Sequence, residues 1–288
     1  MKLVLASAQL GTNYGILNKK KINIKEFKKI TNLVLRSKIK FIDTSSSYGN
    51  SEEIIGSSKL KNLNIISKIK LPKKIKISNM DFWLQKKIYK SLNSLNVNNI
   101  YGLLIHDYKD LLGINGKNYL TCLKKFKKNK IIKKIGISIY SPKELNIIWR
   151  FWKPDIVQAP LNIFDTRISD SGWLDILKKN KVEIFIRSIF LQGLLVNDHN
   201  NIKISKNLEV HLNKFQLWCK KKNISKLVAC INFIKSFKKV NYVIVGINNC
   251  DHLKNIFDIF YSKDRTNLTK KFNTNNLNLI DPRRWRYY

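Results

Sequence analysis

The sequence predicts an α/β protein folded as a (β/α)8 barrel of the TIM type. Eight short runs of β-branched and apolar residues recur along the chain, and segments with helical periodicity separate most of them. Eight such units in roughly 250 residues are typical of this barrel. A doubly wound sheet is the alternative, but "QLGTNYG" (9–15) lacks the GxGxxG spacing of its phosphate-binding turn.

The expected strands read mostly as continuous apolar runs, which is the pattern of strands buried on both faces. They cover residues 2–8, 40–45, 64–68, 100–106, 133–138, 155–160, 182–188 and 241–246. The opening "MKLVLASAQLG" also resembles a secretory signal peptide. Its apolar run is shorter than the roughly 7–15 residues of a signal core, so we expect the first strand there.

The expected helices carry apolar residues on one face and lysines on the other. They cover residues 24–37, 82–95, 117–130, 142–152, 171–180, 207–222, 225–238 and 251–261. Ser141 and Pro142 are typical of a helix start, because serine caps the first turn and proline tolerates it. With no linker in between, we expect a single domain over residues 1–288, with residues 264–288 as a C-terminal tail or loop.

The formal net charge is +36, from 55 lysines and arginines against 19 acids. Such a charge suits nucleic acid or a membrane surface. The cations are spread along the chain, however, and no single segment collects them. A solvated lysine surface is the preferred interpretation, so we predict no specific nucleic-acid partner. No apolar stretch approaches the roughly 18 residues of a membrane span, so we predict no membrane partner either.

The four cysteines show no zinc-like or CxxC spacing (Cys122, Cys219, Cys230 and Cys250). We therefore expect reduced thiols, a cytoplasmic protein and no metal site. Oligomeric state leaves no signal in the sequence.

Polar or ionisable residues end most of the predicted strands. In a (β/α)8 barrel the active site lies at the C-terminal ends of the strands, so these side chains would share one pocket. In chain order they are Asp43, Lys68, His106, Gln158, and Arg187 with Ser188, while the last predicted strand ends at Gly246.

Three of these residues, together with Tyr48 in the segment after the second predicted strand, predict a proton-delivery site. The ammonium of Lys68 would stabilise the phenolate of Tyr48 and lower its pKa, and Asp43 would supply the counter-charge that a buried lysine needs. His106, neutral or charged, would orient a substrate oxygen. A general acid beside a carbonyl oxygen suits carbonyl reduction, and the hydride would have to come from a nicotinamide cofactor.

Several motifs, in order, resemble those of the aldo-keto reductase family. "FIDTSSSYGNSEEIIG" is similar to the family's Asp-Thr-Ala…Tyr-Gly block, "IISK" to its strand-three lysine motif and "LLIHDY" to its strand-four histidine motif. "KKIGISIYS", "DIVQAPLNIFD", "RSIFLQGLL" and "VNYVIVGINN" resemble the ends of strands five to eight. The resemblance runs from about residue 3 to 261 and implies the same barrel.

The resemblance also implies roles for residues of this chain. Asp43, Tyr48, Lys68 and His106 would be the catalytic tetrad, with Tyr48 as the proton donor. Ser138 and Gln158 would hold the nicotinamide carboxamide. The other implied cofactor contacts are Gly11, Thr12, Asp43, Arg187, Ser188, Leu191, Gln192, Gly193, Gly246 and Asn248. The reaction would be NAD(P)H-dependent reduction of an aldehyde or ketone, sugar-derived ones included, with NADP(H) favoured over NAD(H).

The chain departs from the family pattern at several positions. Ile139 replaces an asparagine that contacts the carboxamide, and Arg187 replaces a tyrosine that stacks on the nicotinamide. Asp107 replaces an aromatic residue, which suggests a polar substrate. Usual contacts to a 2′-phosphate are missing near the last strand, where Lys254 or His252 could substitute.

These departures leave alternatives open. The barrel could be catalytically weak and retain cofactor binding for a regulatory role. Arg187 could be an ion-pair partner for Asp43 or Glu53, and Asp43 could merely cap a turn. The tail "NLIDPRRWRYY" could stack on nucleic acid, form a loop over the active-site mouth or be disordered.

Overall fold

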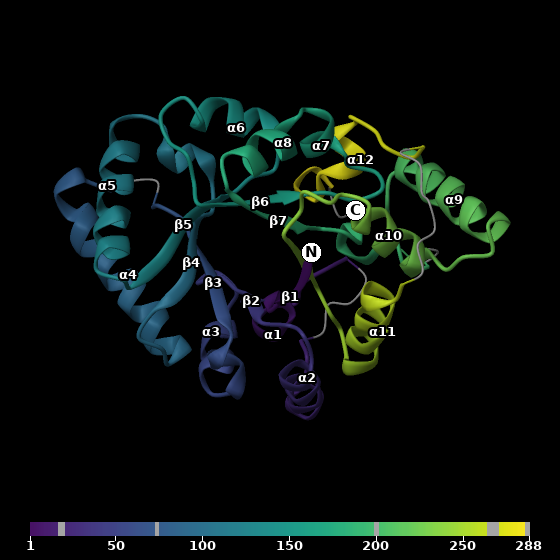
Figure 1. The fold of residues 1–288 in the computed structure, drawn as a ribbon, viewed down its shortest axis with the longest axis horizontal. Coiled ribbons are helices and arrows are strands. Elements are labelled where there is room, and N and C mark those ends of the chain that lie inside the picture. The colour runs from purple at the N-terminus through teal and green to yellow at the C-terminus, as the bar shows by residue number, and fades with distance from the viewer. Residues whose placement is uncertain (17–20, 73–74, 199–201, 264–270, 286–288) are drawn as a thin grey trace.

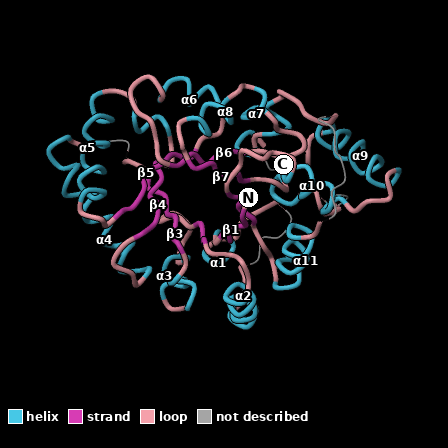
Figure 2. Tube along the Cα trace, viewed as in Figure 1, coloured by secondary structure: helices cyan, strands magenta, loops and turns pink. Residues whose placement is uncertain are grey.

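The structure is a computed structural model that describes residues 1–16, 21–72, 75–198, 202–263 and 271–285. Eight parallel strands form a closed barrel in chain order, and β1 pairs with β8 to close it. Figure 1 shows the strands at the centre of a ring of helices, and Figure 2 separates the two by colour. The predicted (β/α)8 barrel is confirmed.

All eight strands lie within one or two residues of their predicted positions. They are β1 (Lys2–Ala6), β2 (Phe41–Asp43), β3 (Asn64–Ile69), β4 (Ile100–Ile105), β5 (Ile132–Ser138), β6 (Ile156–Pro160), β7 (Glu183–Arg187) and β8 (Tyr242–Val245). Apolar, β-branched runs fix these positions because each strand is covered on both faces.

The predicted helices are present, with shifted ends. They are α2 (Ile24–Arg36), α4 (Met80–Leu95), α5 (Ile114–Lys128), α6 (Pro142–Ile148), α8 (Trp173–Lys179), α9 (Lys206–Lys221), α10 (Lys226–Lys235) and α11 (Cys250–Tyr261). As predicted, the Ser141 hydroxyl caps α6 by accepting the N–H of Lys143, and Pro142 opens the helix.

Four short helices were not predicted, because four to six residues give too little periodicity to recognise. They are α1 (Ala8–Gly11), α3 (Ser51–Gly56), α7 (Arg167–Asp170) and α12 (Leu277–Ile280). Of these, α3 is the helix of the β2–β3 connection, where the sequence analysis placed none.

Inward-facing residues recur at every second position of a barrel strand. An inner core inside the barrel contains Phe41, Ile66, Leu104, Ile156, Phe185 and Ile244. Each lies two residues before a residue predicted to belong to the site: Asp43, Lys68, His106, Gln158, Arg187 and Gly246. The site therefore sits one layer above this core, at the C-terminal ends of the strands.

The C-terminal segment packs beside α7 (Figure 1). The Asn273 amide donates to the Thr166 hydroxyl, and the Thr274 N–H donates to the carbonyl of Phe164. A 3-10 turn, η5 (Pro282–Arg284), follows α12. Residues 264–270 and 286–288 of the predicted tail lie outside the described part of the chain.

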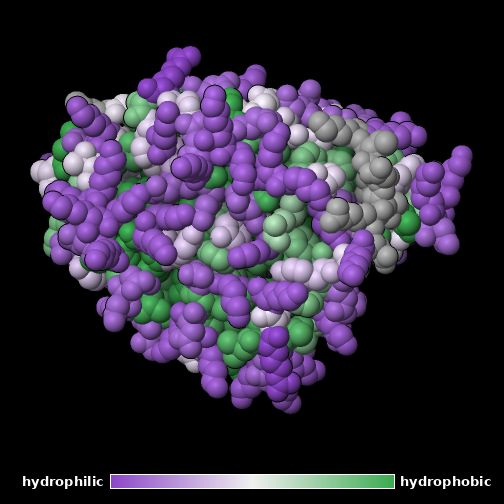
Figure 3. Space-filling model, viewed as in Figure 1, coloured by the Kyte–Doolittle hydropathy of each residue, from purple (hydrophilic) through white to green (hydrophobic). Residues whose placement is uncertain are grey.

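Three of the cysteines are buried and all four are free thiols. Within the described residues, none of the helices has the length and apolar content that crossing a membrane requires. Hydrophilic side chains are spread over the face drawn in Figure 3 and are not gathered over one element.

Candidate active site

A buried ion pair lies at the ends of β2 and β3. The Lys68 ammonium, whose side chain is 2% exposed, lies 2.6 Å from Oδ2 of Asp43 and also donates to the Thr44 carbonyl at 3.0 Å. The other oxygen, Oδ1, accepts the Gln158 amide at 2.7 Å. A buried pair is tolerated only when both charges are well bonded, and these are. Asp43 is thus not a helix cap.

Two glycines position Tyr48 on the loop after β2. A Cβ on Gly11 would lie 1.8 Å from the carbonyl oxygen of Tyr48, so only glycine allows this approach. Gly49 has φ +55°, and a Cβ there would lie 2.3 Å from the Gly11 carbonyl oxygen. The contact between the two glycine backbones brings the Tyr48 ring centroid to 5.2 Å from Nζ of Lys68.

The predicted lowering of the Tyr48 pKa is wrong. Burial raises the pKa of this phenol well above its ordinary value, and the Asp43 carboxylate raises it further, while Arg187 opposes both. Lys68 does not produce the expected effect because its charge is matched by Asp43 at 2.6 Å. Tyr48 therefore keeps its proton throughout the physiological range.

His106 is a neutral imidazole in this site. Burial lowers its pKa to about 4, with smaller contributions in the same direction from Lys68 and Arg187. Its backbone N–H donates to the Ile69 carbonyl at 2.9 Å, which continues the β3–β4 ladder and holds the residue at the rim. Of the two protonation states considered from sequence, the structure favours the neutral one.

Arg187 ends β7 with its guanidinium over the ring of Tyr140, 4.2 Å from the centroid. It donates to the Ile139 carbonyl at 3.0 Å and to the Ser188 hydroxyl at 3.3 Å. Within the described residues it forms no ion pair with Asp43 or Glu53, so that alternative is wrong. The buried Ile139 side chain belongs to the core, and its carbonyl serves to anchor Arg187.

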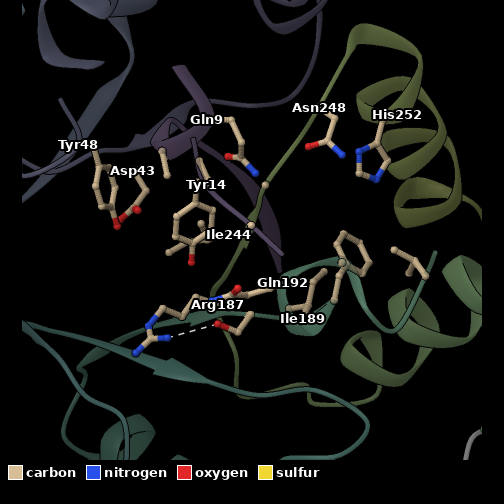
Figure 4. Close-up of a pocket in the computed structure, with 18 of the residues that line it drawn as sticks. Gln9, Tyr14, Asp43, Tyr48, Arg187, Ile189, Gln192, Ile244, Asn248 and His252 are labelled. Carbon is tan, nitrogen blue, oxygen red and sulfur yellow. Dashed lines mark hydrogen bonds between the residues drawn. The ribbon is translucent and has the colours of Figure 1, made fainter. Parts of the chain in front are cut away.

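A cleft with about 940 Å³ of empty space, its open mouth included, runs from Asp43 and Tyr48 to Asn248 and His252. In Figure 4 Tyr48, Asp43 and the head of Arg187 lie toward one end, and Asn248 and His252 lie at the other. Nine predicted residues line it: Asp43, Tyr48, Gln158, Arg187, Ser188, Gln192, Gly193, Gly246 and Asn248.

The other predicted residues are not part of this lining. Lys68 and Ser138 are buried, and Leu191 packs in the hydrophobic core. The Thr12 hydroxyl donates to the Ala8 carbonyl at 2.8 Å and ends α1. The remaining two are Gly11, which supports the Tyr48 loop, and His106.

Two features of the cleft fit a long polar cofactor. The side-chain oxygens of Gln9 and Gln192 are buried without a hydrogen-bond partner among the described residues, although both residues line the cleft. Buried acceptors without partners are costly, and a ligand with N–H and O–H donors would satisfy them. The loop after β7 also holds Ser188 at φ 60° and Gln192 at φ 55°, conformations that are common at ligand sites.

Sequence reasoning missed Gln9, Tyr14 and Ile244 in the lining, and named His252 only as a possible contact to a 2′-phosphate. Tyr14 had a signal, because it lies in the connection that follows β1, where a barrel places functional side chains. Burial of its hydroxyl raises the pKa of Tyr14 to about 12, with Tyr48 and Arg187 among the nearby groups. Figure 4 shows this hydroxyl between Tyr48 and Arg187.

Solved structures share this architecture. A glycerol dehydrogenase from Gluconobacter oxydans superposes with a TM-score of 0.69 at 19% identity, over 94% of this chain and 88% of that one. The holo form of an aldo-keto reductase from Bacillus halodurans gives a TM-score of 0.73 at 16% identity, over 94% and 89%. At such identities the likeness concerns the fold.

The sequence itself carries the family assignment. The comparison with curated proteins found no significant match. The profile of the aldo/keto reductase family, however, matches residues 2–273, nearly the whole chain. This extent includes every strand of the barrel and every residue of the cleft described above. The chain therefore belongs to the aldo/keto reductase family of nicotinamide-dependent oxidoreductases.

Proposed function

We propose that this protein reduces an aldehyde or ketone to an alcohol, with Tyr48 as the proton donor. The bound nicotinamide would supply the hydride to the carbonyl carbon. The phenol gives its proton to the carbonyl oxygen, so one hydride and one proton convert C=O to CH–OH and leave NAD(P)⁺. The proposal rests on the Asp43–Lys68 ion pair, which lies with the Tyr48 ring 5.2 Å from Nζ of Lys68 at one end of the cleft, and on His106 at the end of the neighbouring strand β4.

The raised pKa of Tyr48 is compatible with this role. The developing alkoxide is a much stronger base than a phenolate, so proton transfer from the phenol stays favourable. As the phenolate forms, the positive charge of Arg187, which lowers the Tyr48 pKa, stabilises it. A phenol with a high pKa also remains protonated between turnovers, so the donor is always ready.

His106 positions the substrate. A neutral imidazole has one N–H donor and one acceptor nitrogen, and its N–H can donate to the carbonyl oxygen beside Tyr48. The low pKa keeps a third positive charge out of a site that already holds Lys68 and Arg187.

Cofactor binding follows from the shape of the cleft. Gln158 uses its amide N–H on Asp43, which leaves its carbonyl oxygen to accept from a carboxamide, with Ser138 next to it on β5. The loop residues Ser188 and Leu191–Gly193 would pass the pyrophosphate. Gly246 and Asn248 would contact the adenosine end, and Gly11 and Thr12 would support the loop near the nicotinamide.

For the cofactor we propose NADP(H) over NAD(H). NADP(H) carries one more phosphate, and a protein with a formal net charge of +36 attracts it more strongly. At the far end of the cleft His252 is the described lining residue that could contact the extra phosphate, although burial lowers its pKa. Comparing KM for NADPH and NADH decides between the two.

The test is a carbonyl panel that includes glyceraldehyde, followed by nicotinamide absorbance. We expect Tyr48→Phe to lower kcat by about 10²–10⁴-fold, the contribution of a general acid, while cofactor affinity stays within threefold. Tyr89→Phe, an exposed tyrosine on α4, is the matched control. A fully active Tyr48→Phe enzyme would show that Tyr48 is not the proton donor. Tight cofactor binding without turnover of any substrate would favour the alternative of a catalytically weak, regulatory barrel.

A further inference from the structure

The active-site end of the cleft holds one cation without a counter-charge. Lys68 is matched by Asp43 at 2.6 Å, and His106 is neutral. Arg187 lines the same cleft and has no carboxylate partner among the described residues. Asp43 is the only acid in the described lining, and it is already bonded to Lys68 and Gln158.

The guanidinium of Arg187 has free donors. Its two hydrogen bonds, to the Ile139 carbonyl and the Ser188 hydroxyl, use two of its five N–H groups. The others have no partner in the part of the chain that the structure describes. A half-buried, planar cation with unused donors is well suited to bind a carboxylate or phosphate.

The C-terminal segment holds this arginine in place. The ring of Tyr140 contacts Arg187 at 4.2 Å and also Arg283 of η5 at 3.5 Å, both measured to the ring centroid. Asp281 binds Arg283 through Nε at 2.9 Å and Nη2 at 2.6 Å, so that second guanidinium is neutralised. The backbone N–H of Tyr140 donates to Glu144 at 3.1 Å, which holds the main chain of this residue in place.

The nearby acids are therefore engaged elsewhere, because Asp281 binds Arg283 and Glu144 binds the backbone of Tyr140. The free charge of Arg187 faces the cavity. In Figure 4 its head lies on the side of Tyr48 and Asp43, away from Asn248 and His252. An anionic group held by Arg187 would thus belong to the substrate end of the cleft.

We propose that Arg187 binds an anionic group of the substrate, so that the preferred substrates are carbonyl compounds carrying a carboxylate or a phosphate ester. The inference rests on the proposed carbonyl reduction and adds the substrate class. Arg187 then contacts substrate directly, and Tyr140 with Arg283 are positioning residues.

The kinetic test compares matched pairs of substrates. One pair is 4-carboxybenzaldehyde and benzaldehyde, and the other is glyceraldehyde 3-phosphate and glyceraldehyde. We expect kcat/KM to favour the anionic member of at least one pair by about tenfold or more, and the pair that responds identifies the anion. Arg187→Met should lower kcat/KM for the anionic member by about ten- to a hundredfold, and for the neutral member by no more than about threefold.

The ratio within each pair cancels any effect of Arg187→Met on cofactor binding. Arg150→Gln, which removes one exposed charge that is not part of the cleft lining, is the matched control and should keep the wild-type ratio. Arg187→Lys keeps the charge but loses the planar fork, so its ratio should fall between wild type and Met. Thermal melting confirms that each variant is folded.

A binding measurement separates this inference from the proposed reaction. Isothermal titration of the NADP⁺-saturated protein with 4-(hydroxymethyl)benzoate, glycerol 3-phosphate, benzyl alcohol and glycerol needs no turnover. We expect an anion to bind about tenfold or more tightly than its neutral analogue, and Arg187→Met to abolish that difference. Equal binding of anions and neutral analogues by the wild type, or an anion preference that survives Arg187→Met, overturns the proposal even if the enzyme reduces carbonyls.

Discussion

The two ends of the barrel are built from the same strands but use their inward-facing residues differently. At the C-terminal end Asp43, Lys68 and Gln158 form a buried polar network beside an open cleft. At the N-terminal end four aromatic rings fill the barrel, with centroids as close as 4.3 Å. We call these rings the aromatic plug: Phe41, Tyr101, Phe185 and Tyr242.

Single strands take part in both ends. Phe41 and Asp43 on β2, like Phe185 and Arg187 on β7, are successive inward-facing residues, about 7 Å apart at roughly 3.3 Å per residue. The lower residue of each pair packs in the inner core and the upper one faces the cleft. The comparison teaches that chemistry and packing are separated along each strand, so changes at the two ends should have different consequences.

Lys68→Met should have the largest effect, because it harms both stability and activity. It leaves the Asp43 carboxylate buried without its counter-charge, which costs about 3–5 kcal/mol of unfolding free energy. It also leaves the Asp43 carboxylate, which disfavours the Tyr48 phenolate, without its counter-charge, so kcat should fall by about 10²-fold or more. Urea unfolding and carbonyl turnover measure the two effects.

The double variant Asp43→Asn with Lys68→Met is the control for this change. The neutral pair should recover most of the lost stability, since no unpaired charge remains and the amide oxygen introduced by Asp43→Asn can still accept from Gln158. Activity should stay low. A double variant as active as the wild type would mean that the ion pair only supports the fold.

Phe185→Leu, in the aromatic plug, should affect stability alone. Phe185 stacks on Tyr242 at 4.3 Å with both rings near parallel, and it is fully buried. Removing part of the ring should cost about 2 kcal/mol of unfolding free energy through lost burial and packing. The kcat of the folded enzyme should remain within about twofold of wild type, since catalysis depends on the layer above. A tenfold loss in kcat at unchanged cofactor affinity would show that the two ends are coupled.

The same separation explains what could be predicted from the sequence. The strands are recognisable because apolar runs buried on both faces differ sharply from the lysine-rich helices. Asp43, Lys68, His106 and Gln158 are recognisable as polar residues that end such runs. In both cases the signal lies within a few neighbouring residues.

Contacts between distant residues could not be predicted. Gln158 donates to Asp43 across 115 positions of sequence, and Arg187 and Arg283 meet at Tyr140 through three separate elements. The Tyr48 pKa was predicted in the wrong direction because burial, which the sequence does not report, dominates its electrostatics. Tyr14 was overlooked because α1, the short helix between it and the end of β1, was not predicted.

The low pKa of His106 predicts a pH dependence of stability that arises at the C-terminal end of the barrel. Its pKa is about 4 when folded, against an ordinary value near 6.5 when unfolded, so the unfolded chain binds more protons between these pH values. The contribution of His106 to stability should therefore rise with pH from about 4 to 6.5 and be constant above. NMR titration of ring-labelled histidines should show one resonance titrating near pH 4.

His106→Gln identifies that resonance and should flatten the stability slope between pH 4 and 6.5. His252, whose pKa is also lowered by burial, keeps its own signal in this variant and serves as the internal reference. If the His106 ring titrates at an ordinary pH, the imidazole is more solvated than the structure implies. The prediction that His106 is neutral at pH 6 and somewhat below would then be wrong.

Tyr101→Phe should have the smallest effect. It measures how much a polar contact contributes to stability at the N-terminal end of the barrel. The Tyr101 hydroxyl donates to Glu183 at 2.7 Å, and Lys134 lies 2.7 Å from the same carboxylate. Because Tyr101 and Glu183 are only half-buried and Glu183 keeps its lysine partner, removing the hydroxyl should cost about 1 kcal/mol. Turnover should not change. Since the ring stays in the plug, a loss as large as that of Lys68→Met would mean that hydrogen bonding, and not packing, holds this end of the barrel together.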